Sequence, residues 1–202
     1  DDIFLKLTIT KNNLTLDNVD FTNNIATNIA LISSNTCTVM GSLFTNNSNS
    51  KSNGLNKASC IILKDLGGLN IISSTFINND EELPIIYKEN SNSVVNISNS
   101  ILIDNSNGYA EGLIAGNVDN VMCDYNWWGN TFENINVLPN LNSKISLNNW
   151  LFLNSSYVKY LEHGVNATIN LTLNNLITKS GEVSTFNNYN LPAFYFKINT
   201  SN

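Results

Sequence analysis

Carboxylate and imidazole side chains are the residues of this chain that could carry out catalysis. Glycoside hydrolysis needs two carboxyl groups about 5–9.5 Å apart. The only histidine, His163, precedes Gly164 in a turn signal, which favours a turn residue over a general base. The acidic candidates are Asp17, Asp20, Asp104, Asp119 and Asp124. They do not recur at a common spacing, so the sequence predicts no catalytic residue and no enzyme.

Metal and cofactor chemistry is also not indicated. The acidic run at residues 80–82 supplies too few convergent oxygen ligands for calcium. Cys37, Cys60 and Cys123 are odd in number and have no metal-ligand spacing. We therefore expect buried thiols, no disulfide framework, no metal and no cofactor.

The elements that must position any site come from an internal repeat. The pattern apolar-x-apolar-x-x-small-x-aromatic-x-x-Asn begins at residues 14, 37, 69, 95 and 121. A second apolar phrase precedes each repeat, at residues 3–7, 29–32, 60–63, 85–87 and 112–115. Short β-rich phrases at a period of twenty-odd residues are typical of a β-solenoid, whose turns absorb insertions. The long insertions lie at 48–57, 80–82 and 88–93, and we expect residues 48–54 to be a surface loop and 80–82 a solvated turn.

Stacked coils place equivalent residues on top of one another. The aromatic position predicts an interior ladder of Phe21, Phe44, Phe76, Leu102 and Trp128. The last position of the repeat predicts a ladder of amides at a turn, formed by Asn24, Asn47, Asn79, Asn105 and Asn130. Asparagine tolerates the left-handed backbone of a sharp corner, and its amide can bond to the amide of the next coil.

Trp127 is the one candidate for ligand contact. If Trp128 points into the solenoid, Trp127 points out of it, because side chains alternate along a strand. An exposed tryptophan among asparagines would stack on a sugar ring. The alternative, which we favour, is that Trp127 packs on the end of the solenoid or on the following region through Trp150.

After Asn130 the repeat does not return, and the chain divides into three regions. Residues 1–130 are expected to form the parallel β-helix of about five coils, and 131–146 a cap and linker. The alternating runs in 147–202, including 167–173 and 193–198, predict an incomplete immunoglobulin-like β-sandwich with an open strand edge.

Charge and hydropathy limit the classes of partner that we expect for this protein. The net charge is −6, all ten basic residues are lysines, and they are scattered, so a nucleic-acid partner is not expected. No apolar run is long enough to span a membrane. Seven Asn-x-Ser/Thr sequons predict N-glycosylation if the protein is exported. They are Asn13, Asn46, Asn96, Asn154, Asn166, Asn170 and Asn199.

The phrase Asp124-Tyr-Asn-Trp-Trp-Gly129, the Asn-rich coils and the later Trp150-Leu-x-Leu153 resemble the adhesin-like surface proteins of methanogenic archaea. The resemblance implies a right-handed parallel β-helix of the pectate-lyase-like kind, followed by immunoglobulin-like domains. It also implies a protein of the cell surface used in attachment or in building an outer layer. The lyase chemistry found on such helices uses calcium and an arginine base, and this chain contains no arginine.

These observations favour a non-catalytic, extracellular adhesin-like or structural protein. Its expected partners are cell-surface glycans, or further copies of itself joined by strand addition at open sheet edges. A polysaccharide-binding or polysaccharide-degrading β-helix protein is the alternative.

Overall fold

The structure is a computed structural model that describes most of the chain. The described residues are 3–8, 13–25, 28–33, 35–48, 58–64, 67–79, 82–105, 112–135, 141–156, 168, 170–187 and 190–193. His163, Asn166, Asn199, most of the 48–57 insertion and the first two residues of the acidic run lie outside them.

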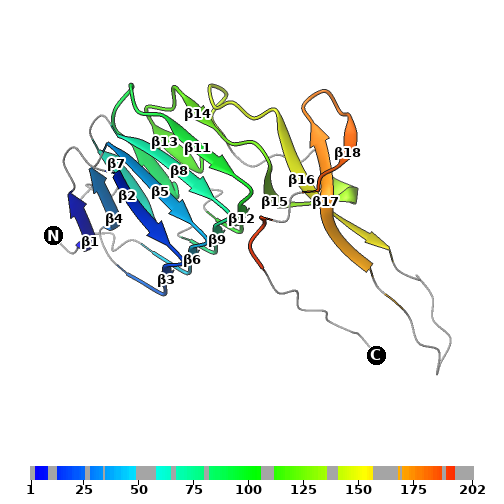
Figure 1. The fold of residues 1–202 in the computed structure, drawn as a ribbon, viewed down its shortest axis with the longest axis horizontal. Coiled ribbons are helices and arrows are strands. Elements are labelled where there is room, and N and C mark those ends of the chain that lie inside the picture. The colour runs from blue at the N-terminus through cyan, green and yellow to red at the C-terminus, as the bar shows by residue number, and fades with distance from the viewer. Residues whose placement is uncertain are drawn as a thin grey trace.

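The fold is a parallel β-solenoid, as the repeat predicts (Figure 1). The first sheet contains β1 (Ile3–Thr8), β4 (Asn28–Ser33), β7 (Ile61–Lys64), β10 (Ile86–Lys88) and β13 (Ile114–Gly116). The second contains β2 (Asn13–Asp17), β5 (Thr36–Met40), β8 (Gly68–Ile72), β11 (Val95–Ser98) and β14 (Val121–Met122). The third begins with β3 (Asp20–Thr22), β6 (Leu43–Thr45), β9 (Thr75–Ile77), β12 (Ile101–Ile103) and β15 (Asn126–Thr131). Each coil thus supplies one strand to each sheet.

In the second sheet, alternate apolar residues of the strands fill the solenoid interior. Cys37 pairs with Leu69, and Val39 pairs with Ile71, in the parallel register between β5 and β8. All four side chains are fully buried. The expectation that the cysteines act as small apolar residues in the core is confirmed for Cys37, and Cys60 and Cys123 are buried as well.

The sharp corners of the coils use left-handed backbone, but not at the ladder asparagines. Between the second and third sheets, the left-handed residues are Asn18, Gly41, Ser73, Asn99 and Tyr125, with φ between 51° and 63°; we call these five the corner row. At the far end of the third sheet they are Asn23, Asn46, Asn78 and Asp104. Each of these four stands one residue before a ladder asparagine. The expectation that the ladder residue itself takes this conformation is therefore off by one position.

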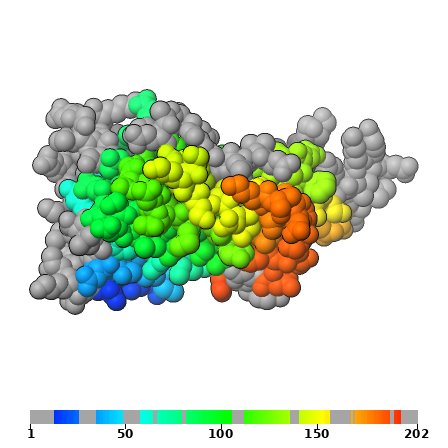
Figure 2. Space-filling model, turned by 90° about the horizontal axis from the view of Figure 1, so that it is seen from above, coloured from blue at the N-terminus to red at the C-terminus, as the bar shows by residue number. Residues whose placement is uncertain are grey.

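The third sheet continues beyond the solenoid. After a 3-10 turn, η1 (Phe132–Asn134), the strand β16 (Asn149–Ser156) pairs in parallel with β15. β17 (Asn170–Thr178) and β18 (Val183–Thr185) then add in antiparallel fashion, which gives an eight-stranded sheet. We call β16–β18 the C-terminal arm. In Figure 1 it lies at the opposite end of the molecule from β1, and in Figure 2 residues of β16 lie between the last coils and β17.

Solenoid pairing therefore does not end at residue 130, where the repeat is lost. Ser146 forms a parallel bridge with Met122, and Ile145 is buried in the solenoid core. Residues 141–153 make a further, partial coil within the region predicted as linker and sandwich. No second sheet faces the arm among the described residues, so the immunoglobulin-like sandwich over 147–202 stays a prediction.

Candidate functional site

The aromatic ladder lies in the solenoid interior at the predicted positions. Phe21 stacks on Phe44 with ring centroids 4.7 Å apart, and Phe44 stacks on Phe76 at 4.6 Å. Leu102 is buried at the next level. Trp128 packs against the end of the same core and against the cluster that contains Trp150. The ladder thus ends on an indole that contacts both the solenoid and the arm.

The asparagine ladder is a chain of amide–amide hydrogen bonds. Asn24 Nδ2 donates to Asn47 Oδ1, Asn47 Nδ2 to Asn79 Oδ1, and Asn79 Nδ2 to Asn105 Oδ1, each at 2.9 Å. The backbone N–H of the donor residue bonds to the same oxygen in every case. Asn130 stands one residue short of the 26-residue spacing, and its Nδ2 donates to the carbonyl oxygen of Asn134 in the turn.

A second polar ladder, which the repeat did not predict, occupies the small position of the repeat. Ser42 N donates to Ser74 Oγ, Ser74 N to Ser100 Oγ, and Ser100 N to Asn126 Oδ1. Each serine hydroxyl also donates to the carbonyl two residues earlier in its own coil. All four side chains are buried. The signal was present in the sequence as serine at three successive small positions.

Trp127 points out of the solenoid, but it is not exposed. Its register places it between Ile101 of β12 and Leu151 of β16, and only 5% of its surface is accessible. Its Nε1 donates to the carbonyl oxygen of Asn130 at 2.9 Å. The expectation of an exposed tryptophan is therefore wrong, because β16 adds to the sheet beside it and the arm covers it. The favoured alternative, packing on the following region, describes Trp127 better, although its partner is Leu151 rather than Trp150.

Tyr125, two residues earlier, is the exposed aromatic of this stretch. It ends the corner row with φ of 63° and keeps 38% of its surface exposed. Its ring stacks on Phe186 with centroids 5.2 Å apart and planes 11° from parallel. Its backbone N donates to Asn149 Oδ1 at 2.9 Å.

A groove of about 680 Å³ lies over the outer face of the third sheet. We call it the outer groove. Its floor consists of outward side chains of β6, β9 and β12, namely Leu43, Thr75, Ile77 and Ile103. Asn18, Gly41 and Ser73 of the corner row also line it, and the chain at 190–193 completes the lining. None of the residues that line the groove carries a charge.

The carboxylates singled out in the sequence are dispersed over the coils. Asp17 accepts a hydrogen bond from Asn18 Nδ2 at 2.7 Å. Asp20 lies in the same first coil, and Asp104 is exposed at a corner of the fourth. Asp124 accepts bonds from the backbone N of Asn148 and Asn149 and from Asn148 Nδ2. Within the described ranges, no three His, Cys, Asp or Glu side chains gather as a metal-binding group.

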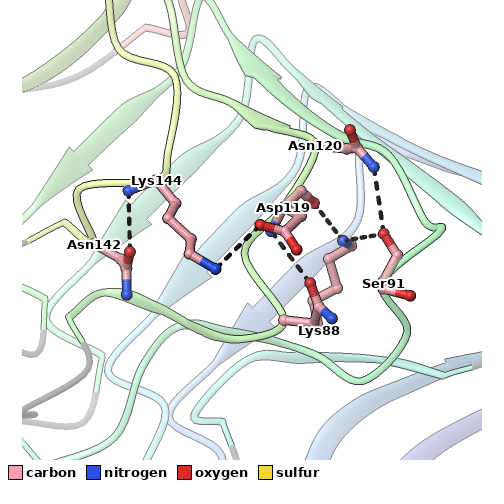
Figure 3. A network of polar contacts seen from close by, with 7 residues as sticks. Lys88, Ser91, Asp119, Asn120, Asn142 and Lys144 are labelled. Carbon is pink, nitrogen blue, oxygen red and sulfur yellow. Dashed lines mark hydrogen bonds and ion pairs between the residues drawn. The ribbon is translucent and has the colours of Figure 1, made fainter.

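Lys88, the last residue of β10 and the first of the insertion at 88–93, forms the most buried cationic contact of the described residues (Figure 3). Its Nζ donates to the carbonyl oxygens of Ser91 and Asp119, at 3.3 and 2.5 Å. Burial lowers the pKa of Lys88, and the nearby Asp119 carboxylate partly opposes that shift. Asp119 also lies 3.5 Å from the Nζ of Lys144. The network joins the loops of two successive coils, which indicates a structural role.

The sequons in the described residues differ in accessibility. Asn13, Asn46, Asn154 and Asn170 are exposed. Asn96 is partly buried, and its Nδ2 donates to Asn70 Oδ1 at 3.0 Å on the outer face of the second sheet.

Comparison with protein-family models, with curated proteins and with solved structures finds no match to this chain. The described part of the chain contains no helix with the length and apolar character needed to cross a membrane.

Proposed function

We propose that this protein is a non-catalytic, adhesin-like module of the cell surface that mediates attachment or builds an outer layer. The observation that carries the proposal is the continuity of the third sheet, which runs from the first coil through β15 into the arm. Such a sheet forms an extended spacer, which suits a protein that holds a binding surface at a distance.

The use of polar residues supports the same function. Asparagine and serine side chains form ladders of hydrogen bonds that join successive coils, as in Asn47–Asn79 and Ser74–Ser100. Buried polar groups whose hydrogen bonds are satisfied specify a fold and contribute little reactive surface. The candidate carboxylates lie in different coils or are engaged by neighbouring amides, which favours attachment over polysaccharide cleavage.

Self-association through the arm is a second form of the same proposal. β18 is the outer strand of the eight-stranded sheet, and its three residues are exposed, Val183 to 56%. An exposed sheet edge is a template for strand addition by another chain. Copies joined at this edge would form part of a surface layer or filament.

The proposal is tested by presenting the purified protein to whole cells and to immobilised cell-envelope material. Saturable binding without release of reducing sugar ends is the expected result. Release of reducing ends from a polysaccharide, at a rate that depends on Asp124 or Asp119, would replace attachment with catalysis. Size-exclusion chromatography with light scattering tests the second form, and a Val183→Lys variant should then be monomeric.

A further inference from the structure

We propose that Tyr125 and the outer groove form one binding track for an uncharged glycan chain, an inference that rests on the attachment function proposed above. The corner row lines the groove from Asn18 to Ser73 and continues through Asn99 to Tyr125. Successive members belong to successive coils, as the bond from Asn99 N to the carbonyl oxygen of Tyr125 shows. The track therefore follows the stacking direction of the coils, with a step of about 4.7–4.9 Å from one coil to the next. A track of this kind suits a linear ligand.

The backbone of Tyr125 is the first reason to assign it a role. The left-handed region is a genuine outlier for a bulky side chain, and the other four positions of the corner row hold Asn, Gly or Ser. Tyrosine at this corner therefore opposes the local backbone preference. Such outliers persist where the surrounding structure enforces them, and they gather at functional sites. Here the bond to Asn149 Oδ1 and the stack on Phe186 hold the residue in place.

The exposure of the ring is the second reason. Stacking on Phe186 orients the Tyr125 ring, yet 38% of the residue remains accessible. A partly exposed aromatic residue whose ring is held on one face is a platform for the apolar face of a sugar. The sequence suggested this role of stacking on a sugar for Trp127, but the arm buries Trp127.

The chemistry of the groove selects the class of ligand. Its lining combines aliphatic side chains such as Leu43 and Ile77 with the uncharged amide of Asn18 and hydroxyl of Ser73. These groups match the C–H faces and hydroxyl groups of a neutral sugar. Asp20, directly paired with Leu43, would repel a polyanion.

A peptide strand fits this surface less well than a glycan does. The groove lies over the face of the third sheet, where the backbone groups of β6, β9 and β12 already pair within the sheet. Strand addition needs an unpaired edge, so an extended peptide would find no backbone partners on this floor.

Affinity electrophoresis of the full chain through gels that contain a neutral glucan, mannan or galactan, or a uronic-acid polymer, tests the proposal. At least one neutral polymer should retard the protein, and Tyr125→Asn should weaken that binding about tenfold. Asparagine occupies the same corner at Asn18 and Asn99, so this variant should keep its fold. Ile77→Glu, which places a charge on the floor, should weaken binding as well.

Phe132→Ala is the matched control, because Phe132 is exposed but lies outside the track. Equal retardation of the wild type and Tyr125→Asn overturns the proposal, as does retardation by the uronic-acid polymer alone, or by none of the polymers. The cell-binding assay separates this failure from that of the attachment function. If Tyr125→Asn protein still attaches to cells as the wild type does, attachment stands and the glycan track falls.

Discussion

Phe44 stacks on Phe76 with their ring centroids 4.6 Å apart and their planes only 3° from parallel. Isolated aromatic pairs prefer offset or edge-to-face arrangements. Here the parallel register pairs the two residues directly, Phe44 with Phe76, and the ring geometry follows the strand spacing. The ladder is therefore a consequence of the sheet, and its stabilising contribution comes from burial.

Replacing Phe44 by alanine is expected to lower the free energy of unfolding by about 3–5 kcal/mol, the usual cost of truncating a fully buried phenylalanine. Urea unfolding followed by circular dichroism measures the change. Phe132→Ala serves as the comparison, because Phe132 is 64% exposed and should change stability by no more than about 0.5 kcal/mol. An equal decrease in the free energy of unfolding in the two variants would show that the buried ladder position contributes no more to stability than an exposed phenylalanine does.

Replacing Asn79 by alanine removes the centre of the amide ladder. Its Oδ1 accepts two bonds from Asn47, and its Nδ2 donates to the carbonyl oxygen of Phe44. Each buried group left without a partner costs about 1–3 kcal/mol, so we expect a total loss of about 3 kcal/mol or more.

Asn78 provides the control for that experiment, because it is exposed and holds the left-handed corner with φ of 53°. Glycine adopts this conformation without strain. The free energy of unfolding of Asn78→Gly, measured with urea, should therefore equal that of the wild type within about 0.5 kcal/mol. An Asn79→Ala protein as stable as Asn78→Gly would contradict the ladder.

The solenoid could be predicted from the sequence because residues of the same type recur once in each coil, at positions that stack on one another. Phe21, Phe44 and Phe76 share one interior row, and their spacing alone identifies the coils. Placement of the left-handed residues was missed by one position. An Asn-Asn pair such as Asn78-Asn79 offers two residues of the same type, and composition does not say which one turns the chain.

The continuation into the arm could not be predicted in the same way. Trp150 and Leu151 alternate like any strand, and periodicity does not distinguish a parallel partner in β15 from an antiparallel one in a separate sandwich. The burial of Trp127 depends on that pairing, so the sequence could not decide between an exposed and a packed Trp127. Tyr125 carries no signal in the sequence except that it fills a corner position where Asn, Gly or Ser otherwise stands.

Asp124 is expected to hold the start of the arm against the last coil. Its Oδ1 accepts a hydrogen bond from the backbone N of Asn148 at 2.7 Å, and its Oδ2 accepts one from Asn148 Nδ2 at 3.1 Å. Asp124→Asn removes the charge, and hydrogen bonds to charged groups contribute about 1.5–3 kcal/mol. Hydrogen exchange of the amides of Asn148 and Asn149 should therefore become faster, while the amide of Ile71 in the core keeps its protection. Unchanged exchange at Asn148 would remove Asp124 from this role.

Sequon occupancy should follow side-chain accessibility. Asn154 and Asn170 are exposed on adjacent strands of the arm, whereas the Nδ2 of Asn96 donates to Asn70. Secretion from a host that performs N-glycosylation should give glycans at the first two sites and none at Asn96. Peptide mass spectrometry reads each site separately. A folded product with a glycan on Asn96 would contradict the placement of that side chain.

Alkaline pH should destabilise the protein through its buried thiols. Burial raises the pKa of Cys37 from its ordinary value of 9.0 to about 11. Below pH 9 the thiol is protonated in both the folded and the unfolded state, so its contribution to stability is fully present. Between pH 9 and 11 only the unfolded state ionises, and stability is lost, on the order of 2–3 kcal/mol for Cys37.

Burial raises the pKa of Cys123 too, and this adds to the loss, while the lowered pKa of Lys88 has the opposite sign and makes stability rise with pH. The contribution of Cys37 is therefore isolated by comparison with a Cys37→Ala variant. Urea unfolding at pH 8, 9, 10 and 11 should show the wild type losing stability more steeply than the variant. Parallel pH profiles would mean that the Cys37 thiol ionises as readily in the folded protein as in the unfolded chain, and that the solenoid interior is open to water at β5.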